Sequence, residues 1–396
     1  MKQVKHILCI LLAIVMSLGF TTQVFAADIG TSTTTKNDVK EIISENFGYM
    51  LDSVLNRAEI YGLQAKNFGN FEILNPVTFN TLDEEIDEST MILHFPIADG
   101  TGNICLIYDV IFTEDGYSAT IGADFAPLLN SIYQEDITSV VLIQDEHSFY
   151  AVSDLVGYLQ QGSTVVSMNK TDYEKLSVRG VELATMLSSS LTANTTFTAL
   201  GKTSYATCIE SKAETKSSAV TGTKSLMNYP IVDQIIDGEQ YGLCWAATVA
   251  SMVRFEKPTS HGTLTAKNVA DYMGIGYDEG GTNSEAKSAL EHYLGSPYVP
   301  TLKNDVLTQA QIKTAIDNID PAYMQCRRPN GFLKYKYHAV ALIGYDFTSE
   351  HTRIEIMDPA YACYKYCTMD SNENWTFAFG AYTYTWIKTI RLLYST

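Results

Sequence analysis

The fold is decided around the stretch Tyr241-Gly242-Leu243-Cys244-Trp245-Ala246-Ala247-Thr248-Val249-Ala250-Ser251-Met252. Its apolar run predicts a buried helix that begins at Cys244 and ends before Pro258. A thiol at a helix N-terminus lies at the positive end of the helix dipole, which favours the thiolate. Because the thiolate is the nucleophilic form, Cys244 is a candidate nucleophile. A small buried cysteine at a helix start is the alternative interpretation.

Two predicted strands downstream carry the groups that such a nucleophile needs. His338 opens the apolar run that extends to Tyr345, and Asp358 ends the run that starts at Arg353. Joined by a short turn, these strands would pair antiparallel and bring His338 and Asp358 to the same end of a sheet. The carboxylate would then hold one ring nitrogen while the other nitrogen accepts the thiol proton.

These three motifs occur in the order found in a known family. The sequence Cys244-Trp245-Ala246-Ala247, the later His338-Ala339-Val340 and the final Asp358-Pro359 resemble the papain-like cysteine peptidases. The resemblance covers residues 226–396. It is strongest to their bacterial branch, which includes streptopain, staphopain and bacteriocin-processing-type domains.

The resemblance implies a fold and a set of roles. It implies an α+β, two-lobed catalytic domain, with Cys244 on a helical lobe and His338 and Asp358 on an antiparallel sheet lobe. Cys244 would be the nucleophile, His338 the general base and Asp358 the orienting group. Papain has asparagine in this third role, whereas aspartate is common in the bacterial relatives. The substrate would be a protein or peptide, with no metal or organic cofactor.

The sequence differs from the family pattern at the glutamine of the oxyanion hole. Relatives usually place it about six residues before the cysteine, where this chain has Gly238. Gln240 lies closer to Cys244 and Gln234 lies further away. We favour Gln234, since an insertion in a surface loop is easier to accommodate than a deletion from a tight turn. Gln240 stays an open alternative.

Residues 1–26 have the pattern of a secretory signal peptide. Two lysines, Lys2 and Lys5, precede an apolar segment from Ile7 to Phe20, and Val24-Phe25-Ala26 fits a cleavage site. The apolar segment is too short for a stable anchor, and no later stretch predicts a membrane span. We therefore expect a secreted, extracellular protein.

The N-terminal half, residues 27–210, is predicted to be a separate α+β domain. A helical pattern from Thr33 to about Tyr61 precedes short β-like runs, which suggests a helix packed on an antiparallel sheet. We find no catalytic constellation in it. Residues 211–225, rich in serine, threonine and lysine, predict an exposed linker that proteases could cut.

Relatives in the family are often exported with a pro-region that covers the cleft until it is removed. The resemblance therefore implies that residues 27–210 are a pro-region that masks the active site in cis, and that the protein is made as a zymogen. A permanent binding or surface domain is the alternative for this half.

The catalytic half, residues 226–396, is predicted to begin with helices and to end with strands. Helices are expected over about 265–273 and 283–293, and the capping box Thr308-x-x-Gln311 predicts a third. Strands are expected at Tyr323–Cys326, His338–Tyr345, Arg353–Asp358, Thr376–Ala381 and Thr385–Leu392. Cys363-x-x-x-Cys367 could be a disulfide or a metal pair, and we treat it as structural.

Charge excludes some partners. The 396-residue chain has 27 basic and 45 acidic residues, a net charge of −18. Loss of Lys2 and Lys5 with the signal would leave 25 basic residues and a charge of −20. Strong negative charge argues against nucleic acid and anionic membrane surfaces as partners.

Two other functions fit parts of the pattern. A peptidoglycan amidase or endopeptidase also uses cysteine and then histidine, but its expected Asp-Cys-Ser-Gly-like surroundings or basic wall-binding repeats are missing from the sequence. A non-enzymatic surface module with a degenerate peptidase fold would be expected to lose one of the three groups, and all three are present.

Overall fold

A computed structural model of the chain describes residues 33–63, 71–81, 91–113, 116–134, 140–144, 148–152, 156–169, 220–330, 334–348, 351–370 and 372–394. These residues form helices and mostly antiparallel sheets, so the predicted α+β class is confirmed. The signal-peptide segment and residues 211–219 of the predicted linker lie outside the described residues.

The elements of the N-terminal half are α2 (Thr33–Leu55), β1 (Glu72–Ile73), β2 (Asn80–Thr81), β3 (Met91–Ala98), β4 (Ile104–Thr113), β5 (Gly116–Gly122), α3 (Ala126–Gln134), β6 (Val141–Gln144), β7 (Phe149–Val152), β8 (Gly157–Gln161) and β9 (Thr164–Met168). After residue 220 come β10 (Gly222–Ser225), β11 (Ile235–Ile236), β12 (Glu239–Gln240), α6 (Cys244–Glu256), α7 (Pro258–His261), α8 (Ala266–Met273), α9 (Asn283–Leu294), β13 (Tyr298–Lys303), α10 (Gln309–Asp317), β14 (Ala322–Pro329), β15 (Tyr335–Phe347), β16 (Thr352–Asp358), β17 (Cys363–Thr368), β18 (Thr376–Phe379) and β19 (Tyr382–Tyr394).

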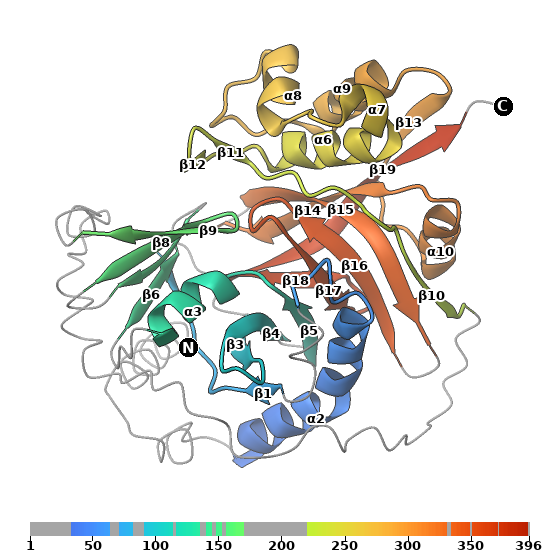
Figure 1. Ribbon diagram of the computed structural model, residues 1–396. Helices are drawn as coiled ribbons and strands as arrows, with labels where there is room; N and C mark the ends of the chain where they lie inside the picture. Colours follow the sequence, from blue (N-terminus) through green and yellow to red (C-terminus); the bar gives the residue numbers. More distant parts are fainter. Residues whose placement is uncertain are drawn as a thin grey trace.

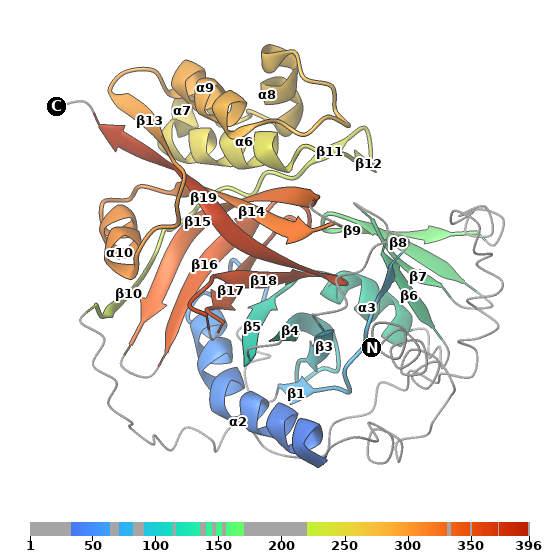
Figure 2. The same ribbon diagram turned by 180° about the vertical axis from the view of Figure 1, so that it is seen from behind.

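One 12-stranded sheet runs through both halves of the chain. Its strand order is β1-β3-β4-β5-β17-β16-β15-β14-β19-β13, with β10 on β15 and β18 on β19 (Figures 1 and 2). The halves join where β17 pairs antiparallel with β5, with Lys365 opposite Gly122. A side chain at Gly122 would lie 2.9 Å from the Tyr364 carbonyl oxygen, so the close approach of the two strands requires glycine there.

This joint differs from the sequence expectation. The sequence predicts two domains separated by a linker over 211–225, but Gly222–Ser225 form β10 and pair with β15. The strand β17, which joins the halves, has no counterpart in the sequence prediction. Its lysine and its two cysteines obscure the strand pattern in the sequence. In the structure β17 is paired on both edges and buried on both faces, and these tertiary contacts override the local signal.

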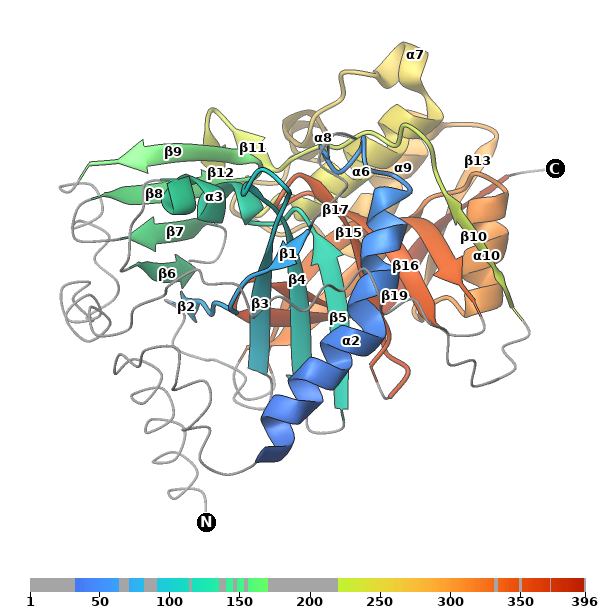
Figure 3. The same ribbon diagram turned by 60° about the horizontal axis from the view of Figure 1, so that its bottom comes forward.

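The N-terminal half contacts β16 and β17 from both faces of the sheet. Side chains alternate along a strand, and the register pairs Glu355 with Tyr366 and Ile356 with Lys365, so Glu355 and Lys365 face opposite sides. Helix α2 packs against β5 and β17 (Figure 3), and Arg57 and Tyr61, which follow it, bind Glu355. The turn between β5 and α3 reaches Lys365 on the other face.

A second sheet of five strands, in the order β2-β6-β7-β8-β9, also belongs to the N-terminal half. It contacts the turn between β18 and β19, where the Gln144 side chain donates to the Phe379 carbonyl oxygen at 3.2 Å and accepts from the Ala381 N–H. Gly380 has a φ of 54°, and a side chain there would collide with Gln144. The five-stranded sheet thus contacts the C-terminal half at the β18–β19 turn.

Helices α6 to α9 form a layer over one end of the large sheet (Figure 1). The predicted helices are present, and each of α8, α9 and α10 begins with a capping box, including the predicted pair Thr308 and Gln311. In α6 every residue from Trp245 to Val253 is buried, against α8, α9 and β15.

Cys363 and Cys367 lie four positions apart on β17, and neither forms a disulfide. A strand rises about 3.3 Å per residue, so their Cα atoms are too far apart for a bridge. None of the helices among the described residues is long and apolar enough to cross a membrane.

Gly122→Ala is expected to destabilise the protein by about 1–3 kcal/mol, because the added methyl group collides with backbone of β17 where the halves join. Chemical unfolding followed by circular dichroism measures the change. Gly48→Ala is the matched control: nothing lies within 4 Å of its new methyl group inside α2, so that variant should unfold no more easily than the wild type. Equal stability of the two variants would contradict the tight joint.

Candidate active site

Cys244 is the first residue of α6, as the sequence predicts. Its side chain is partly exposed, whereas the next nine residues of the helix are all buried. The Thr248 hydroxyl, one turn further along, donates to the Ala339 carbonyl oxygen at 3.1 Å. Since Ala339 follows His338 on β15, this bond fixes the start of the helix relative to the histidine.

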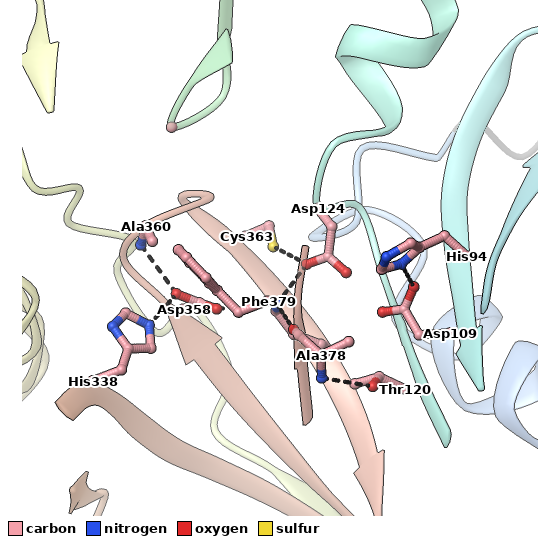
Figure 4. Close-up of polar contacts among 12 residues, drawn as sticks. His94, Asp109, Thr120, Asp124, His338, Asp358, Ala360, Cys363, Ala378 and Phe379 are labelled. Atoms are coloured by element: carbon pink, nitrogen blue, oxygen red, sulfur yellow. Dashed lines mark hydrogen bonds and ion pairs between the residues drawn. The ribbon is translucent and has the colours of Figure 1, made fainter. Parts of the chain in front are cut away.

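His338 and Asp358 are brought together by the pairing of β15 with β16. The strands pair antiparallel, as expected from the sequence, with a register shift between Leu342 and Gly344. His338 Nε2 lies 2.8 Å from Asp358 Oδ1, and Ala360 N–H donates to the same oxygen at 3.0 Å (Figure 4). Their side chains are 6% and 0% exposed, so water does not compete for this hydrogen bond.

The Cys244 side chain interacts with His338 and contributes to raising the pKa of the imidazole. Aromatic rings enclose the imidazole: Phe379 lies 5.3 Å and Tyr384 5.4 Å from it between ring centroids. These rings restrict the rotation of His338 and exclude water from its faces. Cys244, His338 and Asp358 thus form one line of interacting side chains.

Neighbouring charges shift the pKa of both His338 and Asp358. Burial disfavours the charged form of His338, but the negative charge and hydrogen bond of Asp358, followed by the interaction with Cys244, raise the pKa of His338 to about 9. Burial would likewise raise the pKa of Asp358, yet the positive charges of Lys365 and His338 hold it well below its usual range. Near neutral pH the pair is therefore imidazolium and carboxylate.

The two candidate glutamines lie in the hairpin of β11 and β12, ahead of Cys244. Gln234 is 2% exposed, and its Nε2 donates to the Tyr241 carbonyl oxygen at 2.7 Å while its Oε1 is buried without a partner. Gln240 bridges two other segments: it donates to the Ala360 carbonyl oxygen and accepts from Gly162 N–H at 3.1 Å. The pairing of β11 with β12 brings Gln234 beside Tyr241, three residues before the start of α6.

Lys365 is a part of the site that the sequence analysis missed. It is fully buried on β17, with its Nζ 3.0 Å from Asp358 Oδ2 and 2.7 Å from Asp124 Oδ1. Both carboxylates outweigh burial and raise its pKa far above the usual value. A single lysine among the aromatic residues of Cys363–Thr368 was the available signal, because a lysine in such a strand needs a buried partner.

One comparison with known proteins gave a match. Residues 226–388 match the model of the Peptidase_C39 like family, a little under half of the chain. Residues 226–388 form a cysteine peptidase-like domain. No curated protein matches the chain. The matched segment contains Cys244, His338 and Asp358.

The cysteine peptidase-like domain has a thiol that interacts with a charged imidazole, and nucleophilic attack on a carbonyl carbon uses such a pair. Over the described ranges, no group of three or more histidine, cysteine or acidic side chains is placed to hold a metal ion.

Replacement of Asp358 by asparagine in the cysteine peptidase-like domain should lower the pKa of His338 from about 9 to below its usual 6.5 or so, because burial would then be less opposed. NMR titration of the histidine rings, with His338 assigned through His338→Gln, measures the shift. Asp271→Asn, on the exposed face of α8, is the control and should leave the titration in place. An unchanged midpoint in Asp358→Asn would contradict the charge coupling.

Proposed function

We propose that this protein is a papain-like cysteine endopeptidase of the bacterial secreted branch, which hydrolyses peptide bonds through a thioester on Cys244. The proposal is supported by the hydrogen bond between His338 and Asp358, together with the interaction of His338 with Cys244 at the start of α6, inside the matched cysteine peptidase-like domain. In this proposal the helices α6 to α9 form one lobe and the sheet forms the other, with the substrate between them.

In the acylation step the Cys244 thiolate attacks the carbonyl carbon of the scissile bond. The carbonyl oxygen gains negative charge in the tetrahedral intermediate. His338, protonated through its partnership with Asp358, then donates its proton to the leaving amine, and the C–N bond breaks. The first product is an amine, and the acyl group stays on sulfur.

In the deacylation step His338 takes a proton from water, and the resulting hydroxide attacks the thioester. The C–S bond breaks, the acid product leaves, and the thiolate–imidazolium pair is restored. The backbone N–H of Cys244, as the first residue of α6, would stabilise the oxyanion. We assign the second donor to Gln234: its Nε2 donates one N–H to the Tyr241 carbonyl oxygen and keeps a second, whereas both ends of the Gln240 amide are held by Ala360 and Gly162.

We further propose that the chain is exported through residues 1–26 and made as a zymogen cut within residues 211–219. Support for the first comes from the basic and apolar pattern of those residues, and for the second from the serine, threonine and lysine content. The β8–β9 turn of the N-terminal half contacts the β11–β12 hairpin through Gly162 and Gln240. This contact supports masking of the cleft in cis.

An epoxide-type thiol-protease inactivator is expected to label Cys244 and abolish hydrolysis of a denatured protein substrate. Mass spectrometry of the digested product locates the label. Cys244→Ala should lose at least about 10³-fold in activity and take up no label there. Cys105→Ala is the matched control, because burial raises the pKa of that thiol to about 12 and keeps it unreactive.

Three outcomes would contradict the proposal in different ways. Cys244 that stays unlabelled, even after the chain is cut within residues 211–219, would refute the enzyme and leave a non-enzymatic module. Protein that takes up the label but, before labelling, cleaves peptidoglycan cross-links and no protein would be placed among wall hydrolases. Conversion of full-length Cys244→Ala to a shorter form, in the absence of wild type, would refute self-processing.

Gln234→Ala is expected to lower kcat by about 10²–10³ with little change in KM, since an oxyanion donor acts on the transition state. Steady-state kinetics on a fluorogenic peptide measures both constants. Gln240→Ala, which removes contacts to Ala360 and Gly162, should reduce thermal stability more than kcat. The opposite ranking of the two kcat values would assign the oxyanion hole to Gln240.

A further inference from the structure

The N-terminal half contributes a charged group to the line that leads to Cys244. Lys365 has two carboxylates in contact, Asp358 from the catalytic half and Asp124 from the N-terminal half, and all three side chains are at most 2% exposed. A buried lysine between two carboxylates interacts with both, so neutralising one carboxylate changes the electrostatic interaction of the lysine with the other.

We propose that Asp124 is a positioning residue of the peptidase site: it engages Lys365 so that Asp358 keeps its negative charge available to His338. This inference rests on the proposed function. It makes the N-terminal half a lasting part of the active enzyme, which stays bound to the catalytic half after any cut between them.

The conformation of the backbone around Asp124 directs this carboxylate toward Lys365. Asp124 lies in the turn between β5 and α3 with a φ of 23°, a conformation that costs a non-glycine residue free energy. The Gln160 side chain of β8 fixes the turn by donating to the Asp124 carbonyl oxygen at 2.8 Å. The Cys363 thiol donates to Asp124 Oδ1 at 3.5 Å (Figure 4).

Lys365 is also held by its surroundings, so it cannot turn away from either carboxylate. Its Nζ lies 4.3 Å from the centre of the Tyr361 ring and donates to the Ala378 carbonyl oxygen at 3.3 Å. The ammonium group therefore keeps a fixed place between Asp124 and Asp358.

The remaining charged and titratable groups near this line are few among the described residues. Asp109 of β4 acts on Asp124 and pairs with His94 of β3 at 2.7 Å. The other titratable groups are thiols and tyrosines. Cys363 and Cys367 of β17 and Tyr361 interact with Asp124 and Asp358. Cys326 of β14, which pairs with His338, and Tyr323 interact with Cys244.

The sign of the effect follows from the charges. Without the Asp124 charge, Lys365 acts on Asp358 alone and neutralises more of the field that Asp358 exerts on His338. The loss of one nearby negative charge also disfavours the imidazolium directly. Both effects lower the pKa of His338, so the thiolate–imidazolium pair is lost at a lower pH.

The test is the pH profile of kcat/KM for the protein cut within residues 211–219, with both halves present. Asp124→Asn should move the alkaline limb down by about one pH unit. The double variant Asp124→Asn with Lys365→Met removes both charges and should move the limb back to the wild-type position or above it, because no cation then opposes Asp358. The double variant also leaves no unpaired buried charge between the halves, which protects folding.

The matched control is Glu355→Gln. Glu355 and Arg57 form a second buried ion pair between the halves, on the opposite face of the sheet, and this variant removes it. It should reduce thermal stability and leave the alkaline limb in place. If Asp124→Asn behaves like Glu355→Gln, with lower stability and an unmoved limb, Asp124 has a structural role alone and the inference is wrong.

NMR titration of His338 in the Cys244→Ala chain separates this inference from the proposed function. The titration midpoint should fall when Asp124→Asn is added to that chain. An unmoved midpoint, with wild type hydrolysing peptides, overturns the positioning role and leaves the peptidase standing. A moved midpoint, with wild type inactive on every peptide and Cys244 unlabelled, overturns the peptidase and the positioning role with it.

Discussion

Two buried charges on neighbouring strands find their counter-ions across the boundary between the halves. Lys365 on β17 pairs with Asp124, and Glu355 on β16 pairs with Arg57. Removal of one partner from a buried ion pair costs about 3–5 kcal/mol, because the other charge is left in an apolar surrounding. The catalytic half therefore depends on the N-terminal half for its own stability, in addition to the hydrogen bonds between β5 and β17.

The geometry of the site follows from this sheet. β16 lies between β15, which supplies His338, and β17, which supplies Lys365, and β16 itself supplies Asp358. Three adjacent strands thus hold three charged groups in sequence, with strand spacing fixed by backbone hydrogen bonds. Helix α6 adds Cys244 from above, tied to β15 through Thr248.

This dependence bears on the proposal that the N-terminal half is a pro-region. A segment that merely covers a cleft can leave after cleavage, whereas a segment that shares a sheet and supplies two counter-ions leaves unpaired charges behind. Processing between the halves would be expected to free the contact of Gly162 with Gln240 more readily than the β5–β17 pairing, because the former is a single hydrogen bond at a hairpin turn.

The sequence alone determined the elements that local patterns control. The helix that begins at Cys244, the antiparallel strands that carry His338 and Asp358, and the capped helix after Thr308 are all set by apolar periodicity and by end signals within a few residues. Tertiary structure decided the rest. That β17 pairs with β5, that Asp124 binds Lys365, and that Gln234 rather than Gln240 has a buried oxygen without a partner depend on segments far apart in the chain. A buried charge is recognisable only when its partner is known, since a lone aspartate or lysine in a sequence otherwise indicates an exposed position.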